Sequence, residues 1–267
     1  MSKEASGDGE AAPVLRETHG AVAVIRLNRP DRLNAVDEEM IEAIRTAFRA
    51  VWNDAGIRSV VLIGNGRCFM AGADLSVFRA DQANASLSAA RLIDGFHAML
   101  REIRVMPKPV IAAIAGNVAG GGVGLALACD LAVIAEDARL ISGYSKLGTS
   151  PDAGTTWSLT RAVGARRALE LMCLNAPVSA QEALALGLVN RVVPASQLAR
   201  HAIEMAQHLA EGAPMAIANI KSLVEMAATS DFSSQLDRER ACFIECATTH
   251  QFQEGINAFF EKRPPRF

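Results

Sequence analysis

Two glycine-rich turns are the part of this chain whose residue types and spacing could do chemistry through the backbone. The first is Arg67–Leu75, RCFMAGADL, and the second is Gly120–Gly124, GGGVG. Each turn follows an apolar run that predicts a buried strand, and the second turn opens a helical segment. Amides at a helix start have no partner inside the helix, so two such turns from neighbouring strands can direct two N–H donors at one oxygen. That arrangement stabilises an oxyanion.

The turns alone leave a second interpretation open. Glycines that follow a strand often serve only the close packing of a helix against a sheet. A dinucleotide-binding loop also begins in this way. However, residues 120–124 lack the G-x-G-x-x-G spacing, and no G-x-x-x-x-G-K-[ST] sequence occurs in the chain. The choice between an oxyanion site and simple packing therefore needs more than the turns themselves.

The elements around the turns predict a parallel sheet. Four apolar runs predict strands: residues 22–27, 59–63, 109–114 and 131–135. A helix is expected to begin after Asp37, a favourable N-cap, and residues 88–105 predict another helix. The order strand, glycine loop, helix, strand is typical of crossover connections between parallel strands.

Composition excludes several classes of function. The formal net charge of -2 and the scattered basic residues give no support for a nucleic-acid or membrane partner. The five cysteines are odd in number and form no C-x-x-C pair, so neither a disulfide framework nor a metal site is expected. No segment is apolar and long enough to span a bilayer, and no signal peptide is evident. We therefore expect a cytoplasmic protein with reduced thiols.

Three regions are expected along the chain. Residues 1–12, MSKEASGDGEAA, are small and polar and predict a disordered tail. Residues 13–194 hold the strands and both glycine turns and predict the core with the active site. Residues 195–267 are predicted to be helical, with apolar faces that need a partner surface. Pro194 marks the expected boundary between these two regions.

A series of short motifs resembles the enoyl-CoA hydratase/isomerase (crotonase) family, in the same order, from about Val14 to Phe267. The motifs are Leu27–Pro30 with Asn34-Ala35, Ala71–Leu75, Pro107–Ala112, Gly120–Gly122 with Cys129-Asp130, Leu147-Gly148, Val178–Val193 and Ala258–Arg263. The resemblance implies an α/β fold, a crotonase (ClpP-like) spiral of ββα units with a C-terminal α-helical trimerisation region. It also implies a homotrimer or a homohexamer built as a dimer of trimers.

The resemblance implies an acyl-CoA thioester as substrate. Coenzyme A then belongs to the substrate, and no separate cofactor is expected. By motif position, the oxyanion donors are the N–H groups of Ala73 and Gly121, and Ala71 and Asp74 lie beside them in the substrate site. These two amides would hold the thioester oxygen when it becomes an enolate.

The resemblance also assigns contacts with coenzyme A. These map to Asp31, Arg32 and Leu33 after the first strand, and to Lys262 near the C-terminus. In the family the last position can reach the coenzyme A phosphates, sometimes across a subunit interface. A solvated charge on the tail is the alternative for Lys262.

The chain departs from the hydratase pattern of the family, which uses two glutamates. One of these positions is Gly124 and the other is Tyr144. Glycine has no acid–base group, and tyrosine, with a reference pKa of about 10, is a poor base at neutral pH. The sequence therefore disfavours efficient hydration. We expect Tyr144 to line or pack the acyl pocket.

Asp152 offers a different acid–base group. It follows Pro151, where some family isomerases place their single catalytic carboxylate, among them Δ3,Δ2-enoyl-CoA isomerases and 1,2-epoxyphenylacetyl-CoA isomerase. The resemblance therefore favours an enoyl-CoA isomerase that shifts a double bond through a dienolate. A solvated aspartate in a turn after proline is the alternative role for Asp152.

Other functions stay open at this stage. A related branch, the 4-chlorobenzoyl-CoA dehalogenases, has an aspartate nucleophile and a histidine base at positions that resemble Asp152 and His97. His97 would then belong to the substrate pocket, although a core or surface histidine is its simpler interpretation. An enoyl-CoA hydratase and a non-catalytic acyl-CoA-binding subunit are further alternatives, because one fold hosts many functions.

Overall fold

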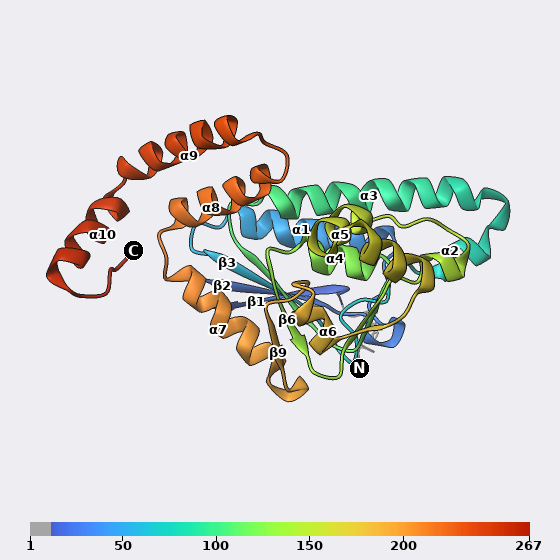
Figure 1. Cartoon of the computed structure of the whole chain (residues 1–267). Coiled ribbons are helices and arrows are strands. Elements are labelled where there is room, and N and C mark those ends of the chain that lie inside the picture. The colour runs from blue at the N-terminus through green and yellow to red at the C-terminus, as the bar shows by residue number, and fades with distance from the viewer. Residues whose placement is uncertain (1–11) are drawn as a thin grey trace, which may run out of the picture.

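A twisted sheet of six strands forms the centre of the molecule (Figure 1). The computed structural model describes residues 12–267, so all but the last residue of the predicted tail lies outside the described part. The strands, in spatial order, are β1 (Val14–His19), β2 (Val22–Leu27), β3 (Ser59–Gly64), β4 (Val110–Ile114), β6 (Leu131–Ala135) and β9 (Arg191–Val193). Only β1 runs antiparallel to its neighbour, and the other pairs are parallel. The predicted parallel sheet is confirmed.

The parallel strands at the centre of the sheet are buried along almost their whole length. All residues of β3 and β4 are buried, as expected for strands covered on both faces. The carboxyl ends of neighbouring parallel strands lie at one edge of the sheet. The loops that follow β3 and β4 therefore emerge side by side, and these loops contain the two glycine turns.

A second, smaller sheet stands beside the first. It has three short strands, β5 (Asn117–Ala119), β7 (Arg139–Ile141) and β8 (Val178–Ser179). Strands β5 and β7 are parallel, and β8 is antiparallel to β7. Because β5 lies directly before the second glycine turn, this sheet fixes where that turn begins.

The helix predicted after Asp37 is α1 (Glu38–Trp52). The Asp37 carboxylate accepts a hydrogen bond of 2.9 Å from the Met40 amide and caps the helix. One apolar face, which includes Ile44 and Phe48, is buried in the core. The helix packs against β1, β2 and the long helix α3 (Ala85–Val105).

The remaining helices follow the strands in chain order. They are α2 (Leu75–Ala80), α4 (Gly121–Ala128), α5 (Thr155–Leu174), α6 (Ala180–Ala185), α7 (Leu198–Ala210), α8 (Pro214–Ala227), α9 (Phe232–Ala247) and α10 (His250–Glu261). Helix α7 follows Pro194 but packs against β2, β3, β4 and β6. The first helix beyond the expected boundary therefore covers the central sheet, and α8 is the first to leave it.

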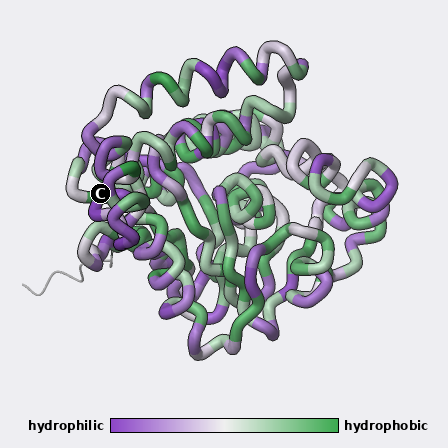
Figure 2. The backbone as a smooth tube through the Cα atoms, turned by 60° about the vertical axis from the view of Figure 1, so that its left-hand side comes forward, coloured by the Kyte–Doolittle hydropathy of each residue, from purple (hydrophilic) through white to green (hydrophobic). Residues whose placement is uncertain are grey.

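Helices α9 and α10 extend away from the central sheet (Figure 1). Apolar stretches alternate with polar ones along the whole chain, including these helices (Figure 2). Several large apolar side chains on α8 to α10 are solvent-exposed, among them Val224, Phe232, Phe243, Phe259 and Phe260. In the described residues no helix is both long and apolar enough to cross a bilayer.

Candidate active site

A cavity of about 510 Å³ opens at the carboxyl edge of the central sheet. Both glycine turns line it, together with the loop that contains Tyr144 and Asp152. Helices α2 and α3 contribute apolar walls, including Phe78, Leu92 and Phe96. A mostly apolar cavity with a few convergent polar groups at this edge of a parallel sheet is the expected form of a small-molecule site.

The Ala73 amide is available to a ligand in this cavity. Val36 and Ala73 form an isolated parallel bridge, in which the Val36 amide donates to the Gly72 carbonyl and the Asp74 amide donates to the Val36 carbonyl, both at 2.8 Å. The residue between these two partners directs its own N–H away from the bridge. Within residues 12–267 the Ala73 amide makes no backbone hydrogen bond.

The Gly121 amide is available for a different reason. Gly121 is the first residue of α4, and the first amides of a helix have no acceptor within the helix. No acceptor elsewhere in the described chain replaces it, whereas the preceding Gly120 amide is bonded to the Ile141 carbonyl. Ala73 and Gly121 both line the cavity. Their role as oxyanion donors stays a prediction, but both amides are placed and free to play it.

Glycine is needed where the two turns approach each other. Gly72 has a φ of +92°, and a Cβ there would lie 3.0 Å from the Ala119 carbonyl oxygen and 3.5 Å from the Gly121 nitrogen. A Cβ on Gly122 would lie 2.3 Å from the Met70 carbonyl oxygen. The close packing that the sequence left as an alternative is therefore present as well. It is also what brings the two turns together.

Asp152 lines the same cavity, and its carboxylate is bonded to Tyr144. The Tyr144 hydroxyl donates to Asp152 Oδ1 at 2.5 Å. Burial raises the pKa of the Tyr144 phenol above its ordinary value, and the charge and hydrogen bond of Asp152 raise it further. The phenol is therefore a protonated donor at neutral pH. Tyr144 was predicted to line or pack the pocket; it does line it, and it also binds the carboxylate.

His97 does not belong to the set of residues that line the cavity. Its Nε2 accepts a hydrogen bond of 3.3 Å from the amide of Ala153, the residue after Asp152. This bond requires that Nε2 carry no proton, which places the proton of the neutral ring on Nδ1. The histidine therefore supports the loop that holds Asp152.

The position of the first hydratase glutamate has no room for a side chain. Gly124 lies in α4 against the loop of Asp152, and a Cβ there would lie 2.5 Å from both Ala153 Cβ and the Ala153 carbonyl oxygen. Real Cβ atoms do not approach other atoms so closely. The packing of the site therefore excludes a carboxylate side chain at this position.

Comparisons with known proteins agree with this geometry. The family model described as enoyl-CoA hydratase/isomerase matches residues 17–267. This chain belongs to that family. A 1,2-epoxyphenylacetyl-CoA isomerase of Escherichia coli (strain K12) is 35% identical over 255 residues, which cover 95% of this chain and 97% of the relative. A short-chain-enoyl-CoA hydratase of Clostridium acetobutylicum is 34% identical over 251 residues, covering 94% and 95%.

A solved structure extends the comparison to the fold. The crystal structure of an enoyl-CoA hydratase from Polaromonas sp. JS666 superposes with a TM-score of 0.92 at 39% identity, and the match covers 95% of this chain and 98% of the other. The predicted crotonase fold with its C-terminal helices is confirmed. The chain is an enzyme of the enoyl-CoA hydratase/isomerase family, and the names of its relatives include both activities.

The residues that the family resemblance assigned to coenzyme A lie next to the first glycine turn. Asp31 and Arg32 line a second, smaller pocket, and Leu33 ends the short 3-10 helix that carries them. The Leu33 carbonyl accepts a hydrogen bond of 3.1 Å from the Ala71 amide. Arg32 Nη1 lies 3.6 Å from an oxygen of Asp74. This segment is therefore joined to the turn that supplies the Ala73 amide.

Lys262 is not brought to either pocket of its own chain. It ends α10, and the tail beyond it returns to the opposite end of the sheet, where the Phe267 carbonyl accepts a hydrogen bond of 2.9 Å from Arg58. Arg58 precedes the first residue of β3, whereas the glycine turns lie at the opposite edge of the sheet, beyond the carboxyl ends of the strands. A contact of Lys262 with coenzyme A could arise only on a neighbouring subunit.

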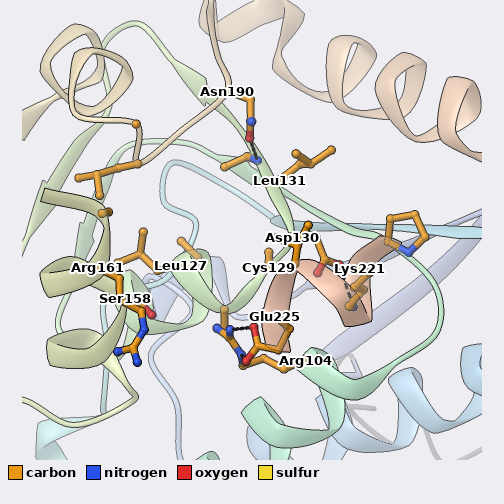
Figure 3. Close-up of a pocket in the computed structure, with 18 of the residues that line it drawn as sticks. Arg104, Leu127, Cys129, Asp130, Leu131, Ser158, Arg161, Asn190, Lys221 and Glu225 are labelled. Atoms are coloured by element: carbon orange, nitrogen blue, oxygen red, sulfur yellow. Dashed lines mark hydrogen bonds and ion pairs between the residues drawn. The ribbon is translucent and has the colours of Figure 1, made fainter. Parts of the chain in front are cut away.

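A larger groove, of about 600 Å³, lies between α8, α5 and the turn that joins α4 to β6 (Figure 3). Its charged groups are mostly paired with one another. Lys221 Nζ lies 2.8 Å from Asp130 Oδ2, and Arg104 Nε donates to Glu225 at 3.1 Å. Paired charges do not attract a charged ligand, so this groove is the weaker candidate for the active site. In residues 12–267 no cluster of His, Cys, Asp or Glu is placed to hold a metal ion.

Sequence reasoning missed two parts of the site. The walls from α2 and α3 lie in a segment whose shape has no sequence signal beyond helical periodicity. The bond between Tyr144 and Asp152 joins residues in an irregular loop, where no spacing rule predicts a contact. The signal available was chemical: the chain's single tyrosine stands where the family has an acid–base group, close in sequence to the only carboxylate that replaces it.

Proposed function

We propose that this enzyme is an enoyl-CoA isomerase that converts 3-enoyl-CoA thioesters into 2-enoyl-CoA thioesters, with Asp152 as its proton-transfer group. One observation carries the proposal. Among the described residues that line the cavity of the two free amides, Asp152 is the only one with a carboxylate. A double-bond shift needs a single base that can both remove and return a proton, whereas hydration needs a second acid–base group.

The proposed reaction proceeds in two proton transfers. The Asp152 carboxylate removes a proton from C2 of the 3-enoyl thioester, and the electron pair moves into the thioester carbonyl to form a dienolate. The negative oxygen is held by the Ala73 and Gly121 amides, with the positive end of the α4 dipole beside them. Asp152 then returns the proton to C4, which leaves the double bond between C2 and C3.

Efficient hydration is disfavoured by the same residues. Water addition needs a group to activate water and a group to supply the α-proton, and the two family positions hold Gly124 and Tyr144. The loss of one general acid–base group typically costs a factor of about 10² to 10⁴ in rate. The site keeps one carboxylate, that of Asp152, which stands at neither of these two family positions.

A second candidate is the isomerisation of 1,2-epoxyphenylacetyl-CoA. The observation that favours it is the Escherichia coli relative of that name, which is 35% identical to this chain. The apolar walls from α2 and α3, with Phe78 and Phe96, suit a ring as well as a linear chain. Both candidates use the two amides to hold a thioester oxygen and Asp152 to move protons.

The test is a panel of acyl-CoA thioesters assayed with the wild type and Asp152→Asn. We expect the wild type to isomerise a 3-enoyl-CoA and to hydrate crotonyl-CoA far more slowly. Asp152→Asn should lose about 10² to 10⁴ in turnover because the general base is gone, while acyl-CoA binding persists. An unchanged rate in Asp152→Asn would remove this residue from the mechanism.

Other outcomes of the panel assign other functions. Halide release from 4-chlorobenzoyl-CoA would identify a dehalogenase. The hydrogen bond that His97 accepts from the Ala153 amide argues against His97 as the base of that reaction. Tight acyl-CoA binding without exchange of the α-proton in D₂O would identify a non-catalytic subunit. Rapid hydration of crotonyl-CoA would identify a hydratase that works without the usual pair of glutamates.

We further propose that the enzyme acts as a homotrimer or homohexamer in the cytoplasm, with residues 13–194 as the catalytic core and the C-terminal region from residue 195 as the source of the subunit contacts. The exposed aromatic residues of α9 and α10 support an interface there. All five cysteines are unpaired, which suits a reducing compartment. Acyl-CoA is the proposed partner, with coenzyme A as part of the substrate.

A further inference from the structure

Tyr144 is held in a fixed place beside Asp152. It is the first residue of a 3-10 helix, Tyr144–Leu147, which is flanked by Gly143 and Gly148, both in the left-handed region. Its side chain is buried, with 7% of the residue exposed, yet it lines the cavity next to Asp152. A buried phenol in a short, capped turn has few alternative positions, so its hydroxyl is a preorganised donor.

We propose that Tyr144 is a positioning residue whose hydroxyl holds the Asp152 carboxyl group directed at the thioester during the proton transfers. This inference rests on the proposed isomerase function. In this role Tyr144 does more than line the pocket. It also does not act as an acid–base group, as the hydratase glutamate at the same position does.

The two oxygens of the carboxylate are used differently. Oδ1 accepts the hydrogen bond from the Tyr144 hydroxyl, whereas Oδ2 has no partner among residues 12–267. One oxygen is therefore anchored and the other is free for a substrate proton. The anchor also removes rotational freedom from the side chain.

Tyr144 itself is unsuited to carry the proton. Burial and the neighbouring carboxylate raise the pKa of its phenol, so it does not ionise near neutral pH. Besides these two residues, no titratable side chain lines the described cavity. From α3, His97 bonds only the backbone of Ala153. The Thr155 hydroxyl at the start of α5 is buried near the phenol, but it makes no hydrogen bond of acceptable geometry and cannot replace this donor.

The first experiment is Tyr144→Phe, which removes the hydroxyl and keeps the ring. A hydrogen bond to a charged group predicts a fall in kcat of about 10- to 100-fold, with KM little changed. Thr160→Ala, an exposed hydroxyl loss on α5, should change neither quantity. Circular dichroism and acyl-CoA affinity report whether the variant is folded.

A second measurement uses the fact that the chain has one tyrosine. Biosynthetic replacement by 3-fluorotyrosine labels Tyr144 alone, so the full enzyme gives a single ¹⁹F resonance that needs no assignment. We expect this resonance to move in Asp152→Asn, because the phenol then donates to a neutral amide in place of a carboxylate.

The outcomes separate this inference from the function on which it rests. If the wild type does not isomerise, or Asp152→Asn keeps its rate, the proposed function fails. If the wild type isomerises and Asp152→Asn is inactive, but Tyr144→Phe keeps kcat, only the positioning role fails. A rise in KM alone would make Tyr144 a wall of the pocket and would also overturn the inference.

Discussion

Gly124 and Ala153 interlock at the point where α4 meets the loop of Asp152. Ala153 is buried and adopts a φ of +54°, which is uncommon for a residue with a side chain. Its methyl group and carbonyl oxygen fill the space that a side chain at position 124 would need. The loop is also bonded to α3 through His97. The position of the Asp152 carboxylate therefore depends on the absence of a Cβ at Gly124.

We predict that Gly124→Ala destabilises the protein and lowers its turnover. The added Cβ meets backbone and a buried methyl group, and such overpacking costs about 1–3 kcal/mol. This cost exceeds the roughly 1 kcal/mol that alanine gains over glycine within a helix. The measurements are thermal unfolding and isomerase kcat, and we expect both to fall.

Gly95→Ala in α3 is the matched control for this prediction. A Cβ at Gly95 would meet Ile41 at 3.5 Å, an ordinary contact, so the helix gain should appear there without a clash. Equal melting temperatures for the two variants would contradict the interlock. The same clash predicts that Gly124→Glu does not create hydratase activity.

At the residue scale, the sequence predicted which groups belong to the site but not the hydrogen bonds between them. The family motifs indicated Ala73, Gly121 and Asp152, and all three line one cavity. The bonds from Tyr144 to Asp152 and from Ala153 to His97 could not be predicted, since irregular loops have no periodicity. The contact of Lys262 with coenzyme A stays a prediction, because its motif position allows a contact across a subunit interface and Lys262 lines neither pocket of its own chain.

At the scale of elements, α1 and α3 are joined by a network of ions. Glu102 on α3 accepts a hydrogen bond of 2.7 Å from Arg45 and one of 2.9 Å from Arg49, both on α1. The hydrogen bond from Arg45 lowers the pKa of the Glu102 carboxyl, against the opposing effect of burial, and Arg49 lowers it further. Helix α3 also supplies the apolar wall of the cavity, so this network steadies that wall.

We predict that Glu102→Gln lowers the free energy of unfolding at pH 7 by about 1 kcal/mol, as expected for a partly exposed ion network. A carboxyl group whose pKa is lower in the folded state than in the unfolded state stabilises the fold at pH values above its unfolded-state pKa. This stabilisation is lost as the pH falls through the folded-state pKa. The difference between wild type and variant should therefore shrink as the pH falls below about 4.3, the unfolded value, and vanish once the pH is below the lowered folded-state pKa. Urea unfolding across this pH range measures it.

The control is Glu136→Gln, an exposed glutamate that has no ion pair in residues 12–267. It should change the unfolding free energy little at any pH. A deficit of Glu102→Gln that stays constant down to low pH would show that the loss comes from packing and not from the charges.

Some of the longer elements were predictable, and the shortest ones were not. The apolar runs located β2, β3, β4 and β6, and the cap at Asp37 located the start of α1. Strands β5, β7 and β8 have three residues or fewer, too few for a period-2 pattern, and α2 has only six. These short elements form the edges of the site because tertiary contacts, and not local sequence, fix them.

At the scale of the whole molecule, the C-terminal helices lack a covering surface. Phe259 and Phe260 on α10 are each 77% exposed and lie in edge-to-face contact with one another. Exposed aromatic residues in such number are costly in water and are typical of a subunit interface. In Figure 1, α9 and α10 extend away from the central sheet.

We predict that Phe259→Asp with Phe260→Asp reduces the assembly to smaller species. Two charges cannot be buried in an apolar interface without partners, so association should weaken. Light scattering after size exclusion should give the mass of a trimer or hexamer for the wild type and a smaller mass for the variant. Leu169→Asp, a similar change on α5, is the control, and equal masses for all three would place the interface elsewhere.

The interlock of Gly124 with Ala153 also bears on how this enzyme could have diverged. A lineage that passes between one carboxylate and two must change α4 and the neighbouring loop together, because a side chain at the helix position is sterically incompatible with the present loop. A side chain added at position 124 alone would yield a damaged intermediate. The two active-site architectures are therefore separated by an epistatic barrier, and we expect descendants of this chain to diversify in their choice of acyl group more readily than in their choice of reaction.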